Sequence, residues 1–238
     1  MSDSEEEEVQ NRTVKITVVG EPATGKSSLC SRYLGGGGGG AGTGSGGTLG
    51  AEVVAGQCAG LRPPVPLQLC DVAGNALATA MLANYLYASD VVLFVYDLTN
   101  LQSFERLQTW FVKVREIFEP EMKKPVMALF GNKSDLEHQR AVRLSVVQKF
   151  ASEHLLENYK GSARTGEMVN SAFTNLVARV LGMKVRVLPT ATNGKSPPPR
   201  EPEVNGRVTL EPSHSLIMNR KALRRIQRKA SSSVCCIQ

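Results

Sequence analysis

Signals for a secreted, membrane-spanning or metal-centred protein are scarce in this sequence of 238 residues. No stretch approaches the roughly 20 consecutive apolar residues that a transmembrane helix needs. Residues 1–11 form an acidic arm where a signal peptide would have an apolar run, so we expect a cytosolic protein whose thiols stay reduced. The five cysteines and three histidines show no spacing typical of zinc ligands, which argues against a zinc site.

Basic charge is scarce in most of the chain and concentrated near its end. The net charge is +6, but residues 1–183 carry 17 Lys and Arg against 19 Asp and Glu, whereas residues 184–238 carry 11 against 3. The basicity therefore belongs to the tail and not to the globular part. A basic tail of this kind can bind nucleic acid or an anionic membrane surface.

The apolar residues predict one α/β domain over residues 12–183. Apolar, often β-branched runs alternate with segments of helical periodicity, which favours a three-layer fold with a six-stranded, mainly parallel sheet and helices on both faces. The predicted strands are Val14–Val19, Glu52–Cys58, Val65–Cys70, Val91–Tyr96, Val126–Phe130 and Glu157–Lys160. The predicted helices are Ser28–Leu34, Ala76–Tyr87, Ser103–Phe118, Leu144–Ser152 and Glu167–Leu181.

Two segments interrupt this alternation. Residues 35–47 contain 10 glycines in 13 positions, which predicts a flexible loop. Residues 184–238 hold half of the chain's 12 prolines and have little apolar content until residue 216, so we expect a tail that is disordered in solution.

The segment Gly20–Ser27 carries the clearest chemical signature. It reads GEPATGKS, matches the pattern GxxxxGK[ST], and lies between a predicted strand and a predicted helix, as a phosphate-binding P-loop requires. Lys26 would neutralise charge on the β- and γ-phosphates, and the Ser27 hydroxyl would bind Mg²⁺. The other predicted nucleotide contacts from this part of the chain are Gly20, Glu21, Ala23, Thr24, Gly25 and Ser28.

Two later motifs select the base. Asn132-Lys133-Ser134-Asp135 follows a predicted strand, at the edge where such sheets bind ligands. The Asp135 carboxylate can accept hydrogen bonds from N1–H and the exocyclic amine of guanine, a donor pair that adenine lacks. The Ala163 N–H would meet guanine O6, so GTP and GDP are the predicted ligands. The full set of predicted contacts here is Asn132, Lys133, Asp135, Ser162, Ala163 and Arg164.

Between these motifs, Asp71-Val72-Ala73-Gly74 follows another predicted strand. Asp71 would hold Mg²⁺ through water, and the Gly74 N–H would contact the γ-phosphate. Thr48 would give the metal a second hydroxyl, so Ser27, Thr48 and Asp71 form the predicted metal site. No single motif of this kind is specific, but their order and spacing together are.

Together these motifs resemble those of the Ras superfamily of small GTPases. The segment Tyr96-Asp97-Leu98-Thr99-Asn100, with Ser103-Phe104 and Trp110, is similar to the Rab branch, and the whole pattern is most like a divergent Rab isoform. The resemblance implies a P-loop G domain that binds GTP or GDP with Mg²⁺ and remodels its switch loops around the γ-phosphate. It also implies a monomer that works with an exchange factor, a GTPase activator and effectors.

Four positions depart from the family pattern. Asn75 replaces the usual glutamine that orients the attacking water, so hydrolysis is expected to be slow. Pro22 stands where glycine is usual, and its ring would crowd the space above the γ-phosphate. The glycine-rich residues 35–47 lose more backbone entropy on closing over GTP, which predicts weaker nucleotide retention. Cys70 replaces a tryptophan on the surface that Rab effectors contact, which puts the usual Rab partners in doubt. The predicted catalytic residues are Asn75, Lys26 and Gly74.

The tail predicts a membrane anchor. In residues 216–230, six basic residues recur on one half of a helix and apolar residues on the other, a pattern typical of helices that bind anionic membranes. The last four residues, 235–238, read CCIQ. As a C-a-a-X signal they predict farnesyl on Cys235, whereas in the Rab manner both Cys235 and Cys236 carry geranylgeranyl. We therefore predict peripheral attachment to the cytoplasmic face of an intracellular or plasma membrane.

Two functions remain open on the sequence alone. One is a membrane-docked GTP/GDP switch with slow GTP hydrolysis, acting in vesicle trafficking. The other is a non-catalytic adaptor in which the guanine nucleotide is structural, a reading favoured by Asn75, Pro22 and the glycine-rich loop. A nucleic-acid-binding NTPase is a third class, and the C-terminal cysteines argue against it because they favour a membrane surface as the partner of the basic tail.

Overall fold

The computed structural model describes residues 12–35 and 47–183 of the chain. The predicted acidic arm, most of the predicted glycine-rich loop and the whole predicted tail, with its basic segment and Cys235 and Cys236, lie outside the described residues.

The described part is built on one six-stranded sheet, with strand order β2-β3-β1-β4-β5-β6. Within it, β2 pairs antiparallel with β3 and all other neighbours are parallel. The strands are β1 (Val14–Val19), β2 (Ala51–Cys58), β3 (Val65–Val72), β4 (Val91–Asp97), β5 (Val126–Asn132) and β6 (Glu157–Lys160). All seven residues of β4 are buried, which explains why its sequence is a continuous apolar run without alternation.

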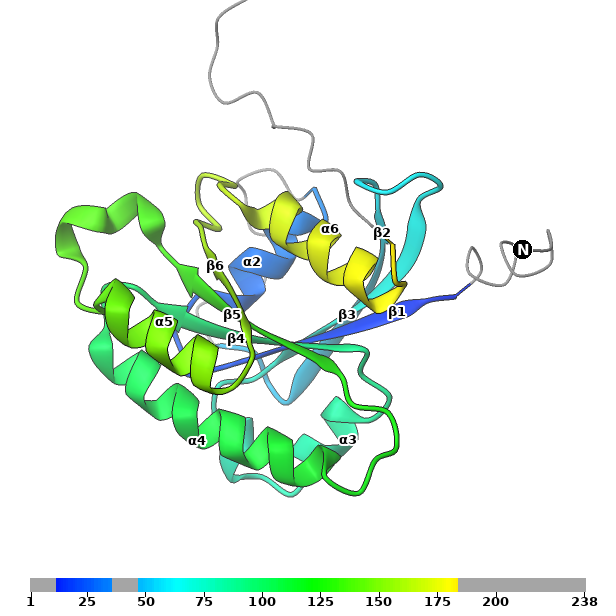
Figure 1. The fold of residues 1–238 in the computed structure, drawn as a ribbon, viewed down its shortest axis with the longest axis horizontal. Helices are drawn as coiled ribbons and strands as arrows, with labels where there is room; N and C mark the ends of the chain where they lie inside the picture. The colour runs from blue at the N-terminus through cyan, green and yellow to red at the C-terminus, as the bar shows by residue number, and fades with distance from the viewer. Residues whose placement is uncertain (1–11, 36–46, 184–238) are drawn as a thin grey trace, which may run out of the picture. The chain divides into compact units, whose positions relative to one another are not determined.

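Helices cover both faces of the sheet (Figure 1). On one face lie α2 (Lys26–Tyr33) and α6 (Val169–Val180), and on the other lie α3 (Leu82–Leu86), α4 (Leu101–Phe118) and α5 (Leu144–Glu153). Each face has its own apolar core, one containing Leu29 and Phe173 and the other containing Phe94 and Trp110. The predicted three-layer fold with a mainly parallel sheet is therefore confirmed.

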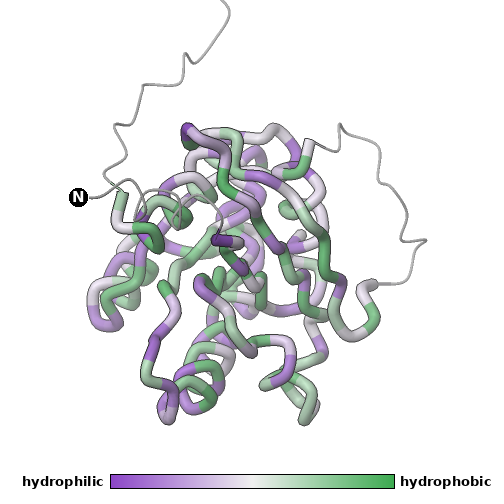
Figure 2. Tube along the Cα trace, turned by 90° about the vertical axis from the view of Figure 1, so that its right-hand side faces the viewer, coloured by the Kyte–Doolittle hydropathy of each residue, from purple (hydrophilic) through white to green (hydrophobic). Residues whose placement is uncertain are grey.

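The longest helix, α4, shows how periodicity sets this packing. Its buried residues include Phe104, Leu107, Phe111 and Phe118 at the predicted helical spacing, and the Asn100 side chain caps its first turn by accepting from the Ser103 N–H at 3.4 Å. Figure 2 shows hydrophobic residues interleaved with hydrophilic ones along the helices that flank the sheet. Among the described residues, no helix combines the length and apolar character needed to span a bilayer.

Several predicted boundaries were wrong. The helix predicted over Ala76–Tyr87 is broken into a 3-10 turn, η1 (Ala76–Ala78), and the short α3. The break is at Thr79, whose backbone is extended and whose hydroxyl donates to the Ala76 carbonyl at 2.8 Å, a local bond that competes with helix.

Three helix starts also differ from prediction, among them that of α4, which begins at Leu101 and not at Ser103. α2 begins at Lys26 and not at Ser28, directly after Gly25 in a left-handed conformation, so Lys26 and Ser27 occupy its first turn. α6 begins at Val169 and not at Glu167, because Met168 has a φ of 58°, which the helix cannot continue through. The difference in α2 matters for function, since it places Lys26 and Ser27 at the start of a helix.

The order of the strands decides where the loops meet. β1 lies between β3 and β4. The connection after β1 leads to α2 on one face of the sheet, whereas those after β3 and β4 lead to α3 and α4 on the other face. A crevice forms outside the carboxyl ends of parallel strands at such a point and is the usual ligand site of open α/β sheets. The segments after β1, β3, β5 and β6 all reach this edge, which brings together the motifs predicted to bind nucleotide.

Candidate functional site

The loop between β1 and α2 needs glycine at both ends. A Cβ on Gly20, whose φ is 142°, would lie 2.2 Å from the Val95 carbonyl oxygen, and one on Gly25 would lie 2.4 Å from Asn132 Nδ2. The loop therefore passes close to β4 and to the last residue of β5. It ends at the start of α2, where free backbone N–H groups and the helix dipole favour a bound phosphate.

Lys26 is held inside this loop. Its Nζ donates to the carbonyl oxygens of Gly20 and Glu21, each at 2.9 Å, and the side chain is buried. Burial lowers the pKa of Lys26, while the nearby carboxylates of Asp71 and Glu21 oppose that shift. The ammonium is thus fixed and poorly hydrated, a state in which it binds an anion strongly.

A cavity of about 450 Å³ opens beside this lysine. It is lined by Pro22, Ala23, Gly25, Lys26, Ser27, Ser28, Gly47, Thr48, Leu49, Gly74 and Asn75. A larger cavity of about 790 Å³, bordered by α4, β5 and Arg179 of α6, holds none of the predicted site residues. The smaller cavity is therefore the candidate site for the phosphates.

Three oxygen-bearing side chains meet next to the lysine. Ser27 Oγ donates to Asp71 Oδ2 at 2.5 Å, and Thr48 Oγ1 lies 3.0 Å from Ser27 Oγ and 3.3 Å from Asp71 Oδ2. Burial raises the pKa of Asp71, and hydrogen bonds from Ser27 and Thr48 oppose the rise. Asp71 Oδ1 is buried and has no hydrogen-bond partner among the described residues. An unpartnered carboxylate oxygen beside two hydroxyls is the hard, oxygen-rich environment that Mg²⁺ prefers, so the residues fit this ion.

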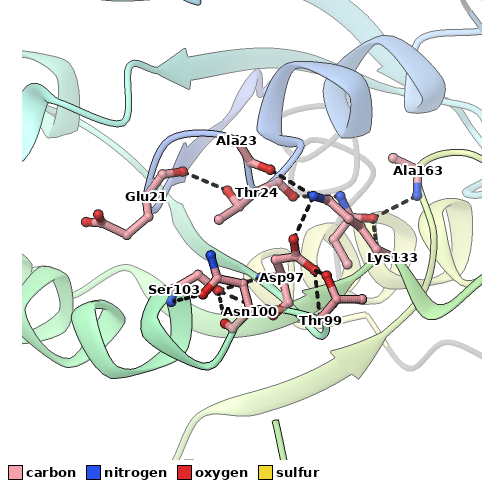
Figure 3. Close-up of polar contacts among 10 residues, drawn as sticks. Glu21, Ala23, Thr24, Asp97, Thr99, Asn100, Ser103, Lys133 and Ala163 are labelled. Carbon is pink, nitrogen blue, oxygen red and sulfur yellow. Dashed lines mark hydrogen bonds and ion pairs between the residues drawn. The ribbon is translucent and has the colours of Figure 1, made fainter. Parts of the chain in front are cut away.

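The last residue of β5 and the residue that follows it are hydrogen-bonded to the P-loop. Asn132 Nδ2 donates to the Thr24 carbonyl at 2.8 Å, and Lys133 Nζ donates to the Ala23 carbonyl at 3.0 Å and pairs with the Asp97 carboxylate at 2.6 Å (Figure 3). Burial alone would raise the pKa of Asp97, but hydrogen bonds from Lys133 and Thr99 outweigh it and lower this pKa below its usual value. These bonds fix the predicted base site relative to the phosphate site.

Asp135 is held by the loop after β6. The buried Ser162 hydroxyl donates to Asp135 Oδ1 at 2.5 Å and accepts from the backbone N–H groups of Arg164 and Thr165 at 3.1 and 3.2 Å. The Arg164 guanidinium lies 3.8 Å from Asp135 Oδ2, with its side chain 82% exposed. Asp135 therefore keeps a carboxylate oxygen near the site edge in a fixed orientation.

One predicted base contact looks different in the structure. The Ala163 N–H, predicted to meet guanine O6, donates to Asn132 Oδ1 at 2.9 Å. A guanine oxygen must therefore share this donor with Asn132 or displace it. The sequence could not show the competing bond, because it joins the end of β5 to a loop residue 31 positions further along the chain.

Gly74 lies against Pro22 of the P-loop. A Cβ on Gly74 would lie 2.3 Å from Pro22 N and 2.7 Å from its ring Cδ, so the two backbones are in direct contact. Asn75 is exposed and lines the cavity next to them. The proline ring that was predicted to crowd the γ-phosphate thus also faces the glycine predicted to contact that phosphate.

Sequence reasoning missed three residues that contact the P-loop or its partners. Asp97 pairs with Lys133, and Trp110 and Arg106 of α4 both contact Glu21. The sequence carried only a weak signal for these contacts. A carboxylate such as Glu21 inside a phosphate-binding loop needs a positively charged or hydrogen-bonding partner, but no neighbouring residue in the sequence identifies that partner.

A P-loop after β1, an aspartate at the end of β3 and an Asn-Lys-x-Asp segment at the end of β5, all at one edge of a mainly parallel sheet, define the class of P-loop guanine-nucleotide-binding proteins. Residues 15–182 match the model of the Ras family, and the chain belongs to that family. Its members bind GTP and GDP with Mg²⁺ and hydrolyse GTP.

Among curated proteins the similar chains are Rab proteins and a Ras-related plant protein. The chain is 29% identical to Ras-related protein Rab-28 of Caenorhabditis elegans over 233 residues, which cover 98% of this chain and 89% of that protein. It is 34% identical to Ras-related protein rab-39 of the same organism over 174 residues, 72% of this chain and 74% of that one. It is 30% identical to Ras-related protein RHN1 of Nicotiana plumbaginifolia over 170 residues, 71% and 82% of the two chains. The chain is therefore a Rab-like member, which confirms the family predicted from its motifs.

Proposed function

We propose that this protein is a guanine-nucleotide switch that hydrolyses GTP slowly while docked on the cytoplasmic face of a membrane, in vesicle trafficking. The observation that carries the proposal is that Lys26, Ser27 and Thr48 line one cavity and that Asp71 accepts from the hydroxyls of the latter two. The end of β5 that leads to Asp135 is hydrogen-bonded to the same P-loop. Exchange factor, GTPase activator and effectors are proposed partners by family membership. The experiments on Lys26 and Asp135 in the Discussion test its nucleotide-binding part.

Each group has a role in binding. The Lys26 ammonium, held by two carbonyl oxygens, offsets the charge of the phosphates, and the backbone N–H groups at the start of α2 donate to them. Ser27, Thr48 and Asp71 would hold Mg²⁺, which when bound neutralises charge on the phosphate oxygens. Asp135 accepts from the guanine edge, and Ser162 keeps its carboxylate in place.

Hydrolysis depends on how a water is oriented beside the γ-phosphate. Asn75 borders the cavity, but its side chain is one methylene shorter than the usual glutamine, so it reaches less far. We expect Asn75→Gln to raise the single-turnover rate of GTP hydrolysis about tenfold, equivalent to about 1.4 kcal/mol of transition-state stabilisation. Phosphate release from preloaded protein measures this rate.

Asn84→Gln is the matched control, because Asn84 is an exposed asparagine on α3 outside the cavity lining and receives the same added methylene. Its rate should equal that of the unmodified protein. An unchanged rate of hydrolysis in Asn75→Gln would instead favour the adaptor function. The close packing of Pro22 against Gly74 also favours the adaptor function, because it narrows the space for a γ-phosphate.

Membrane docking is proposed to depend on Cys235. One prenyl chain binds a bilayer only marginally, so the six basic residues of 216–230 would supply the second signal, at about 1 kcal/mol each near an anionic leaflet. Cys235→Ser should move the protein from the membrane fraction to the soluble fraction whatever nucleotide is bound, as measured by fractionation of cells.

The matched control is Cys236→Ser, which also separates the two lipid routes. It leaves a single farnesyl on Cys235 intact by the C-a-a-X route and removes one of two geranylgeranyl groups by the Rab route, as mass spectrometry of the C-terminal peptide can show. An unmodified, intact C-terminus on protein from its native cells would refute the membrane part of the proposal.

A further inference from the structure

Glu21, the second residue of the P-loop, has a side chain that extends from the loop to helix α4. Its Oε1 accepts from the indole N–H of Trp110 at 3.0 Å, and its Oε2 lies 3.3 Å from Nε of Arg106. Figure 3 shows its carboxylate directed away from Thr24 and the rest of the drawn group. The Glu21 side chain is 13% exposed and Trp110 is fully buried, so this contact is largely shielded from water.

A carboxylate at this position needs such partners. A negative charge inside a loop that binds phosphates repels the ligand, and the repulsion is strong where water is excluded. The hydrogen bond from Trp110 and the ion pair with Arg106 turn the charge towards α4 and partly neutralise it. Trp110 cannot follow the loop if it moves, because its ring is packed in the apolar core beneath β4.

The main chain of Glu21 contacts Lys26, the predicted catalytic lysine. The Glu21 carbonyl oxygen accepts from Lys26 Nζ at 2.9 Å and from Thr24 Oγ1 at 2.9 Å. The side chain of Glu21 therefore anchors to a helix, while its carbonyl fixes the ammonium that faces the phosphates. A shift of Glu21 moves one of the two oxygens that orient Lys26.

We propose that Glu21 is a positioning residue that ties the P-loop to α4 and thereby holds the Lys26 ammonium in place for the β-phosphate. This rests on the proposed nucleotide-binding function of the loop. Trp110 is the chain's only tryptophan, so its fluorescence reports on this contact without added labels. The side chain of Arg106 is 59% exposed and pairs with Glu21, so a substitution at this surface position of α4 would act on the P-loop through Glu21.

The test uses the full chain loaded with a fluorescent GDP analogue and measures its rate of release. Glu21→Ala removes both side-chain contacts and should speed release about tenfold. Glu21→Gln keeps an oxygen that accepts from Trp110 but loses the charge, so release should speed up only about threefold, and Arg106→Gln should match it. Lys113→Gln is the control, because Lys113 is a half-exposed cation on the same helix that pairs with Glu116 and does not contact the loop.

Two further readouts separate positioning from simple loss of stability. Trp110 emission should change between nucleotide-free and GDP-bound protein, and this change should disappear in Glu21→Ala but persist in Lys113→Gln. In a double-mutant cycle, Glu21→Ala combined with Trp110→Phe should release GDP no faster than Glu21→Ala alone, since Glu21→Ala already removes the hydrogen bond that Trp110→Phe removes.

Additive effects in that cycle, or a release rate in Glu21→Ala and Glu21→Gln equal to that of Lys113→Gln, would overturn the proposal. Glu21→Gln is nearly isosteric and Arg106 lies at the surface, so these variants decide the matter even where Glu21→Ala or Trp110→Phe unfolds. If the unmodified protein does not retain the GDP analogue at all, that result refutes the proposed nucleotide-binding function, and with it the proposed role of Glu21.

Discussion

Lys26→Ala is expected to abolish tight binding of both GTP and GDP. Removing one partner of a buried, hydrogen-bonded charge pair costs about 2–5 kcal/mol, since the other partner is left desolvated and unpaired. That range corresponds to a loss of affinity between about 30-fold and about 4,000-fold. The structure places this variant towards the upper end, because Lys26 is buried and held by two carbonyl oxygens, so no mobile water can replace its ammonium at low cost.

Equilibrium titration with fluorescent GDP and GTP analogues measures the effect. Lys149→Ala serves as the control for loss of one positive charge, because the Lys149 side chain is 78% exposed and pairs with Glu153 on α5. That variant should bind as the unmodified protein does. Circular dichroism establishes that both variants are folded. A folded Lys26→Ala protein that binds within threefold of the unmodified protein would show that the cavity beside α2 is not the phosphate site.

The sequence predicted the fold and the phosphate loop well, and the reasons are local. β4 is buried at all seven positions and therefore reads as an uninterrupted apolar run. Gly20 and Gly25 are required because a Cβ would lie 2.2 Å from the Val95 carbonyl oxygen at the first position and 2.4 Å from Asn132 Nδ2 at the second. Steric requirements of this kind leave a fixed spacing in the sequence, so the loop could be located without a structure.

The contacts between loops could not be predicted in the same way. Trp110 and Glu21 are 89 residues apart, and Lys133 and Asp97 are 36 apart, so nothing in their spacing pairs them. Their pairing depends on strand order, which brings the ends of β1, β4 and β5 to one edge. The competing bond between the Ala163 N–H and Asn132 has the same origin.

The break before α3 was missed for a different reason. The segment from Ala76 to Tyr87 has enough helix-forming residues to favour a helix, and one hydroxyl decides the outcome. Thr79 bonds back to the Ala76 carbonyl and takes an extended backbone, which ends η1 after a single turn. Propensity is a weak indicator where a single side chain offers the backbone an alternative partner.

The second large effect is expected from Asp135→Asn, which should reverse the choice of base. Guanine presents N1–H and an exocyclic amine, and both need an acceptor. A carboxylate accepts twice, whereas an amide accepts once and presents an N–H₂ group where the second donor lies. Loss of one hydrogen bond to a charged group costs about 1.5–3 kcal/mol, and the second guanine donor left facing an N–H₂ group costs about 1–3 kcal/mol more, so GTP affinity should fall by about 100-fold or more.

Asp135→Asn should gain affinity for xanthine nucleotides as it loses affinity for guanine nucleotides. The C2 carbonyl of xanthine accepts from the new amide, so XTP should bind the variant more tightly than GTP does, whereas the unmodified protein should prefer GTP. Ser162 supports this outcome, because its hydroxyl holds Oδ1 of Asp135 at 2.5 Å and can hold the amide oxygen in the same place. Competition of GTP, XTP and ATP against a fluorescent GDP analogue measures all three affinities at once.

Glu153→Gln is the control for this substitution, since it exchanges a half-exposed carboxylate for an amide on α5, which does not line the nucleotide cavity. It should leave the preference for GTP unchanged. The result also tests the competing bond at Ala163. If that N–H stays with Asn132 on binding, Asp135 is the main source of selectivity against adenine, and the variant should lose most discrimination between GTP and ATP. Equal binding of ATP and GTP by the unmodified protein would refute the assignment of Asp135 to guanine, because a fixed carboxylate at that position has no matching donors on adenine.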